Sequence, residues 1–371
     1  MERELIERIR AQAKQDGRLE VGIGDDAAIL TRSGRSFVVT VDMLTEGVDF
    51  LSGQVSPRLI GRKSLAVNLS DLAAMGAEAD SVFVAVALPR SQPVSLADEL
   101  TAGILELAHE YNVLLAGGDV NCWSEGLVVS ITAIGKRLPE GALLRSAARP
   151  GDVLLATGGF GGSMLGRQFL FTPRLREAVD LVRRYGVDAG MDVSDGLLLD
   201  LNRFAMESRV GFLLDDASVP IHPDVERAAI CVRRANLLVP QYRTAAEILN
   251  FRNCVQFPVA DPETISEEEI LGIASWLCGD VNDETGLFDY DPLFHALSDG
   301  EDFELLLAAR PETAEVLLRD QPLVCYGTEL TRLGEFLPES AGRKRKTRNG
   351  NIVTAQACGF LHHMEDINTN K

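Results

Sequence analysis

The feature that most limits the fold is an alternation of apolar, strand-like runs with amphipathic stretches over residues 1 to about 145. The apolar runs are Ser36–Val41, Ser81–Leu88, Val113–Ala116 and Leu127–Ile134. Amphipathic stretches with helical spacing lie between them, one after Ser56-Pro57 and one from Leu96 to Tyr111. Serine is a favourable N-cap and proline suits the first helical position, so the start of the first helix is well marked. Such a chain belongs to the α/β or α+β class.

The pattern breaks at Arg149-Pro150-Gly151-Asp152, and Val153–Thr157 then starts a new strand before a glycine-rich turn. The 371 residues also exceed what one ordinary hydrophobic core requires. We therefore predict two domains, residues 1–148 and 149–371. A looser, acidic and proline-containing segment at about 231–290 interrupts the second domain as an insertion. We expect this insertion to be peripheral and to carry none of the chemistry, although it is placed where it could cover a ligand pocket; the alternative is that its apolar residues join the core of the second domain.

Charge and cysteine content exclude several classes of protein. A formal net charge of -19 argues against nucleic-acid or anionic-membrane partners, and no run of eighteen apolar residues occurs. The six cysteines are scattered without a C-x-x-C pair, which predicts ordinary thiols in a reducing cytoplasm. The basic run Arg343–Arg348 precedes Asn349-Gly350, so we interpret it as one arm of a solvated hairpin.

The informative polar residues are aspartates at the ends of apolar runs or beside glycine, where α/β folds place ligand-binding loops. Each motif alone has a simpler interpretation as a turn, a helix start or an amphipathic face, and only their co-occurrence favours a site. Oxygen ligands of this kind suit Mg²⁺ bound together with substrate phosphates. The residues are Asp25, Asp26, Asp42, Asp71, Asp119, Asp192 and Asp195.

A chemistry that moves a phosphoryl group fits this composition, because it needs positioning and charge neutralisation more than a covalent nucleophile. No convincing Ser-His-Asp or Cys-His arrangement is present. The segment Thr157–Ser163 lacks the end of a Walker A loop, so we interpret it as a tight turn, with a phosphate cradle as the alternative. Arg62 and Lys63 are expected to be solvated, with phosphate contact as the alternative.

Taken together, the motifs resemble those of thiamine-monophosphate kinases from about Glu4 to Phe360. The block Asn68–Ala77 is the most specific of them. The resemblance implies a two-domain fold of the aminoimidazole-ribonucleotide-synthetase type, a dimer formed through the first domain, and phosphoryl transfer from ATP to thiamine monophosphate. The matching motifs are Gly22–Ala27, Asp42–Val48, Lys63–Ala77, Gly117–Asp119, Arg145-Ser146, Arg149–Asp152, Asp192–Leu197 and Gly300–Leu306.

The resemblance also implies roles for individual residues. No catalytic nucleophile is implied. Magnesium ions would be held by Asp26, Thr40, Val41 through its backbone carbonyl, Asp42, Asp71, Asp119, Asp192 and Asp195. ATP would contact Gly118, Asp119, Arg145 and Ser194, whereas Asp49, Glu301 and Phe360 would line the thiamine site.

Four positions depart from the family pattern: Val41, Asp49 in place of a histidine, Val120 and Asp299. A carboxylate such as Asp49 repels a phosphate monoester unless a metal intervenes. Two alternatives stay open, a related ATP-using synthetase of the same superfamily and an inactive paralogue that binds nucleotide or a thiamine compound.

Overall fold

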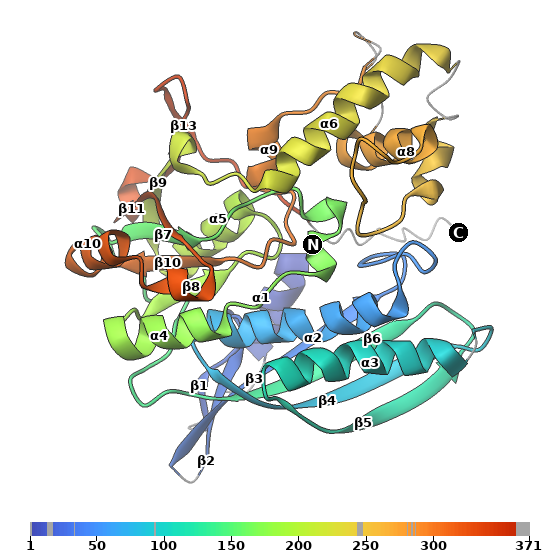
Figure 1. Cartoon of the computed structure of the whole chain (residues 1–371). Helices are drawn as coiled ribbons and strands as arrows, with labels where there is room; N and C mark the ends of the chain where they lie inside the picture. Colours follow the sequence, from blue (N-terminus) through green and yellow to red (C-terminus); the bar gives the residue numbers. More distant parts are fainter. Residues whose placement is uncertain are drawn as a thin grey trace, which may run out of the picture.

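The computed structural model describes residues 2–12, 18–32, 34–92, 94–242, 248–279, 281, 282, 285 and 287–360. Within them the chain forms two β-sheets with helices packed on and between them (Figure 1). This confirms the predicted mixed α/β class. None of the helices in these ranges is both long and apolar enough to cross a bilayer.

The first sheet has six strands in the order β1-β2-β3-β6-β4-β5, and only the β4–β5 pair is parallel. Its strand β6 buries every second residue, as expected for a sheet with one covered face. Helices α2 and α3 cover that face (Figure 1). The elements are α1 (Glu2–Gln12), β1 (Leu19–Val21), β2 (Ala28–Arg32), β3 (Arg35–Thr45), α2 (Pro57–Ala74), β4 (Glu78–Pro89), α3 (Val94–Glu110), β5 (Leu114–Trp123) and β6 (Val128–Lys136).

The second sheet has seven strands in the order β13-β12-β9-β11-β7-β10-β8. Its central strands β7 and β10 are buried along their whole length, since helices or the first half of the chain cover both of their faces. The elements are β7 (Val153–Thr157), α4 (Leu175–Tyr185), β8 (Ala189–Asp192), α5 (Leu197–Glu207), β9 (Val210–Asp215), α9 (Pro292–Ser298), β10 (Leu305–Ala309), α10 (Pro311–Asp320), β11 (Leu330–Pro338), β12 (Arg343–Lys346) and β13 (Ile352–Thr354). Strands β12 and β13 form the hairpin expected around Asn349-Gly350.

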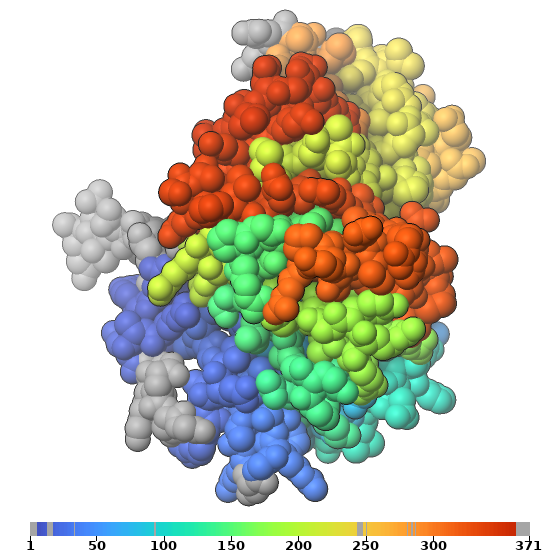
Figure 2. Space-filling view, turned by 90° about the vertical axis from the view of Figure 1, so that its left-hand side faces the viewer, coloured from blue at the N-terminus to red at the C-terminus, as the bar shows by residue number. Residues whose placement is uncertain are grey.

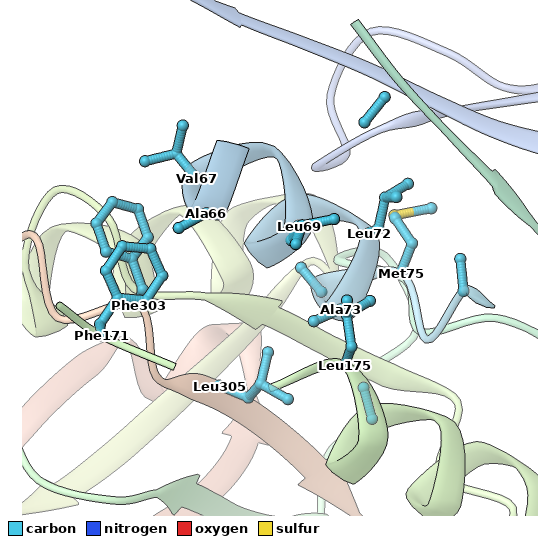
Figure 3. Packing of buried hydrophobic residues seen from close by; sticks show 14 of the residues in the cluster. Ala66, Val67, Leu69, Leu72, Ala73, Met75, Phe171, Leu175, Phe303 and Leu305 are labelled. Carbon is cyan, nitrogen blue, oxygen red and sulfur yellow. The ribbon is translucent and has the colours of Figure 1, made fainter. Parts of the chain in front are cut away.

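Helix α2 connects the two sheets, because it is buried on nearly all sides. The Ser56 hydroxyl caps it by accepting a hydrogen bond from the Leu59 amide, and Pro57 opens it, as the sequence predicts. Leu69 and Leu72 lie on α2 and Met75 is its C-cap, while Phe303 and Leu305 reach the helix from the second half (Figure 3). One hydrophobic core therefore spans both halves at the level of α2.

The expectation that Arg62 and Lys63 are solvated is wrong for both residues. The Lys63 side chain is only 1% exposed, and its ammonium group donates to Gln168 Oε1 at 2.6 Å. Arg62 donates to the carbonyls of Phe169 and Phe171 at 3.1 and 2.7 Å. Helix α2 packs between two layers over most of its surface, so long cations on its packed sides must find partners inside the protein.

The segment predicted as an insertion contributes the end of α6 (Pro223–Leu238) and all of α8 (Glu267–Cys278), together at one end of the molecule (Figures 1 and 2). Ser266 and Glu269 form the expected capping box of α8. The described apolar residues of the segment pack mainly with one another in a third cluster, and Phe257 also packs against the core around α2. That cluster contains Cys231, Val232, Ile248, Val255, Ile270, Ile273 and Phe288.

Candidate functional site

Three carboxylates from separate parts of the chain meet where α2 passes between the sheets. Asp26 precedes β2, Asp71 lies on α2 and Asp192 ends β8. Each of them places a carboxylate oxygen within 4.8 Å of the other two. The first sheet, the connecting helix and the second sheet thus each supply one acid, as the sequence predicts for a shared site.

Hydroxyl and amide groups orient these acids. The Thr40 hydroxyl donates to Asp71 Oδ2, and the Ser70 hydroxyl donates to Asp192 Oδ2 at 2.6 Å. The backbone amide of Asp42 donates to Asn68 Oδ1 at 3.2 Å, which ties strand β3 to α2. Asn68 and Asp71 are one helical turn apart on the same face of α2, so the helix presents both to β3.

Burial and mutual repulsion raise the pKa values of these acids. Burial is the first cause for Asp71 and Asp192, whose pKa values lie well above the usual range, and the charges of neighbouring aspartates raise them further. Burial also raises the pKa of Asp42 to about 6 and that of Asp25 to about 7. The site therefore has more acids than its own cations can neutralise.

Arg145 is the cation that contacts this group. Its guanidinium binds the Asp26 carboxylate through two nitrogens, with Nε donating at 2.9 Å, and its backbone amide lies 3.3 Å from Asp25 Oδ1. Burial and the charge of Asp26 act on the guanidinium in opposite directions, and its pKa lies above the usual value. Two neighbouring N–H donors of a guanidinium also suit a phosphate, so Asp26 and a nucleotide phosphate would compete for the Arg145 side chain.

The carboxylate cluster of Asp26, Asp71 and Asp192 fits a divalent cation. Its donors are hard oxygens held together despite repulsion, which a bound cation would relieve. Asp42 and Thr40 lie beside the cluster and add oxygen donors, so these five residues would hold the metal.

Asp195 and Ser194 lie three and two residues beyond Asp192, in the turn before α5. The Asp195 carboxylate pairs with Arg203, and its backbone amide donates to Asp200 Oδ2 at 2.8 Å. Asp200 is fully buried and also accepts from Arg203 at 2.8 Å. Asp200 and Arg203 therefore orient Asp195, and the motifs alone did not single out either residue.

Gly118 and Asp119 lie elsewhere, on the exposed edge strand β5. Strands β6 and β4 separate β5 from β3, which is roughly 14 Å at ordinary strand spacing. Asp119 pairs with Ala85 of β4, and the register continues across β6 to Met43 of β3, not to Asp42. The Met43 side chain is 61% exposed, so this row of the sheet faces away from α2. Within one chain, the structure thus does not bring Asp119 to the carboxylate cluster.

Val41 points away from the carboxylate cluster as well. Its side chain is 62% exposed, whereas its neighbour Thr40 is 7% exposed and contacts Asp71. Because side chains alternate along a strand, Thr40 and Asp42 face α2 and Val41 faces outward. Only the backbone of Val41 is placed near the cluster.

A cavity of about 200 Å³ opens beside Asp195. It contains all three residues expected at the thiamine site, Asp49, Glu301 and Phe360, together with Ser194 and Asp195. Ser194 and Asp195 follow Asp192 closely in the chain, so this wall of the cavity adjoins the carboxylate cluster. Its remaining walls are formed by Gly47, Val48, Phe50, Leu51, Gln54, Val55, Met164, Gln168, Phe169, Phe257, Trp276 and Asp299.

Lys63 supports the wall of this cavity. Its ammonium group lies 2.9 Å from Glu301 Oε2, donates to the Asp49 carbonyl at 3.2 Å and sits 5.0 Å from the centre of the Phe169 ring. Glu301 has a positive φ of 57°, a conformation that the surrounding contacts must hold in place. Lys63 therefore links Asp49 and Glu301, two of the three predicted substrate residues of the cavity.

Phe257 and Trp276 come from the insertion and line the cavity. The sequence allowed the insertion to cover the pocket, but it did not single out these two aromatic residues. The glycine-rich turn Thr157–Ser163 lies outside the cavity lining, and its Gly161 amide donates to Asp302 Oδ1 at 2.9 Å. An amide that is already bonded to a carboxylate is a poor phosphate donor, which favours the turn interpretation.

Comparisons with known proteins agree with this arrangement. The family model "AIR synthase related protein, N-terminal domain" matches residues 24–136. A thiamine-monophosphate kinase from Rhodopirellula baltica is 32% identical over 99% of both chains. The thiamine-monophosphate kinase of Bacillus subtilis is 35% identical over 60% of this chain and 76% of its own. The solved structure of AaThiL complexed with AMPPCP and TMP superposes with a TM-score of 0.66 at 21% identity, covering 98% of this chain and 97% of that one, which shows the shared fold.

Proposed function

The chain belongs to the thiamine-monophosphate kinase family, and from this premise we propose that it transfers the γ-phosphoryl group of ATP to thiamine monophosphate, yielding ADP and thiamine diphosphate. A terminal phosphate oxygen of the acceptor forms the new bond to the γ-phosphorus as the bond to the bridging oxygen of ADP breaks. No phosphoenzyme and no covalent nucleophile are needed for this in-line transfer.

The observation that carries the proposal is the contact between two dissimilar sites. The carboxylate cluster of Asp26, Asp71 and Asp192 suits a hard cation with phosphates. The adjoining cavity combines aromatic walls with carboxylates, a chemistry that suits a cationic heteroaromatic ring. Ser194 and Asp195 lie on the cavity wall only a few residues from Asp192, so a phosphate carried by a ligand in the cavity would reach the cluster.

The protein's own residues divide the work. Asp26, Thr40, Asp42, Asp71, Asp192 and Asp195 would hold magnesium, which when bound neutralises charge on the phosphates. Arg145 releases one or both of its bonds to Asp26 and turns its donors to the phosphates of ATP. Ser194 contacts ATP beside Asp195, and Phe360, Glu301 and Asp49 orient the acceptor. Closing the cavity around the acceptor excludes water, which would otherwise take the phosphoryl group.

Gly118, Asp119 and the Val41 carbonyl complete the proposed nucleotide and metal site in a homodimer formed through the first domain. Strand β5 leaves one edge unpaired over ten residues, and Val41, Met43, Phe83 and Val120 are 44–68% exposed. An edge and an apolar face of this kind favour association with a second copy. The proposed dimer would change the surroundings of Asp119, whose predicted role depends on it. The cytoplasm is the proposed location, where ATP and reduced thiols are available.

Product analysis tests the function directly. Purified protein is incubated with ATP and Mg²⁺ and with thiamine, thiamine monophosphate or pyridoxal phosphate, and the products are separated chromatographically. Thiamine diphosphate and ADP in equal amounts, formed from the monophosphate alone, are expected. ATP consumption without a thiamine product would favour another synthetase of the superfamily, and binding without turnover would favour an inactive paralogue.

A further inference from the structure

The inserted segment reaches across to the first domain and closes one side of the cavity. Phe257 and Trp276 line the cavity together with Val55 and Gln54, which precede α2. Phe257 forms an isolated β-bridge with Val55. Its ring also lies 6.4 Å from that of Phe169, which belongs to the hydrophobic core around α2. The segment is therefore part of the cavity wall as well as a unit with its own apolar cluster.

Gln54 connects the inserted segment to the loop before α2 through hydrogen bonds. Its side-chain amide nitrogen donates to the Arg252 carbonyl at 2.6 Å. Its backbone carbonyl accepts from the Phe257 amide at 2.7 Å. Gln54 is 5% exposed, so water cannot easily replace these bonds. The position of the aromatic wall is thus set from the loop that also carries Asp49.

Arg252 in turn fixes Trp276. Its guanidinium donates to Ser275 Oγ at 2.8 Å and lies 5.5 Å from the centre of the Trp276 ring. The indole N–H donates to the Arg252 carbonyl at 3.2 Å. Because Arg252 covers one face of the indole, the other face and the ring edge are the parts that can meet a ligand. Trp276 is 37% exposed and borders the cavity.

The cavity around this indole is acidic. Asp49, Asp195, Asp299 and Glu301 line it, and no lysine, arginine or histidine is among its described lining residues. Three of the four acids have a basic partner, namely Arg203, His295 and Lys63. The Asp49 carboxylate instead accepts from the Thr45 backbone amide at 2.6 Å, which leaves its charge uncompensated by a side chain among the described residues.

We infer that Trp276 is a specificity-determining residue that stacks on the positively charged ring of the acceptor, with Asp49 supplying the compensating charge. The inference rests on the proposed function, since it assigns a ring-recognition role within that acceptor site. The electron-rich face of an indole attracts a cation, and stacking adds to that attraction. The insertion thus provides selectivity for a cationic ring and leaves the phosphoryl transfer to the other residues.

The test measures binding of two ligands by calorimetry, with Mg²⁺ and without ATP. One ligand is thiamine monophosphate, and the other is an isostere in which a neutral thiophene replaces the thiazolium ring. The Trp276→Leu substitution should raise the Kd for thiamine monophosphate about tenfold and that for the isostere about threefold or less. Trp276→Phe should lie between wild type and Trp276→Leu. In turnover, the KM for the acceptor should rise while the KM for ATP stays constant.

Leu237→Ala is the matched control, because Leu237 lies on α6 and is 78% exposed without lining the cavity. It should bind both ligands as the wild type does. Unchanged binding of thiamine monophosphate by Trp276→Leu would overturn the inference, and so would equal losses for the two ligands. A wild type that binds the monophosphate in a Trp276-dependent way without phosphorylating it would overturn the proposed function and leave this inference standing.

Discussion

Two groups of buried acids lie near α2, and they differ in how their charge is balanced. In one, Glu304 and Glu177 share Arg174, whose Nε donates to Glu304 Oε2 at 2.8 Å. In the other, Arg145 is the one cation among the described residues that contacts the group of Asp26, Asp71 and Asp192, and it binds Asp26. The first group is complete as it stands and supports the fold. The second holds its acids against repulsion, which is characteristic of a site that binds a cation.

Asp71→Asn should produce the largest effect on activity. We expect kcat to fall by about a hundredfold or more, because an amide cannot replace a carboxylate that helps to neutralise a moving phosphoryl group. Removal of one repelling acid should at the same time raise the melting temperature of the metal-free protein. Steady-state kinetics and thermal unfolding in EDTA measure the two effects. Near wild-type turnover would refute the contrast between the two groups.

Glu304→Gln, in the balanced group, should lower stability and leave the activity of the folded protein nearly unchanged. The substitution leaves Arg174 partly unpaired in a buried position, so the free energy of unfolding should fall by about 3 kcal/mol. The kcat of the folded fraction should stay within about twofold of wild type, because the Glu304 side chain belongs neither to the cavity lining nor to the carboxylate cluster. Denaturant unfolding and active-site titration check this. A loss of activity without loss of stability would place Glu304 in the functional site instead.

Arg145→Ala tests the one cation of the unbalanced group. We expect the KM for ATP to rise about tenfold, with a smaller change for the acceptor, since a forked donor to phosphate is lost. Arg145→Lys should recover only part of the loss, because an ammonium group cannot bind two oxygens in the same geometry. Initial rates at varied ATP measure this, and an unchanged dependence on ATP would remove Arg145 from the nucleotide site.

Local sequence signals predicted much of this structure. The cap of α2, the capping box of α8 and the hairpin at Asn349-Gly350 were all anticipated. Each depends on a turn residue or a helix spacing, and such features are encoded over a few neighbouring residues. The meeting of Asp26, Asp71 and Asp192, which are far apart in the sequence, was expected instead from the co-occurrence of the acidic motifs and from the family resemblance.

The features that escaped prediction depend on contacts between distant segments. The burial of Lys63 follows from a second layer on α2, which the helix's own sequence does not reveal. The bond between Arg145 and Asp26 joins residues 119 positions apart, and Trp276 reaches the cavity only through Arg252 and Gln54. The placement of Asp119 on a distant edge likewise depends on strand order. Local patterns specify elements and caps, whereas pairing across the fold decides which charges are balanced.

The smallest expected effect is a pH dependence of stability that Mg²⁺ removes. Burial raises the pKa of Asp42 to about 6 and that of Asp25 to about 7 in the folded protein, and it also raises the pKa values of Asp71 and Asp192 well above their usual range. A group whose pKa is raised by folding stabilises the folded state at low pH, and this contribution is lost as the pH rises through the folded pKa.

In EDTA, the melting temperature should therefore fall between about pH 5 and pH 8. Mg²⁺ binds the ionised acids, so its stabilising effect should be near zero at pH 5 and on the order of 5 °C at pH 8. Asp71→Asn is the control, and in this variant the stabilisation by Mg²⁺ should differ less between pH 5 and pH 8. Equal stabilisation by Mg²⁺ at both pH values would mean that the metal binds elsewhere and that these acids are balanced in some other way.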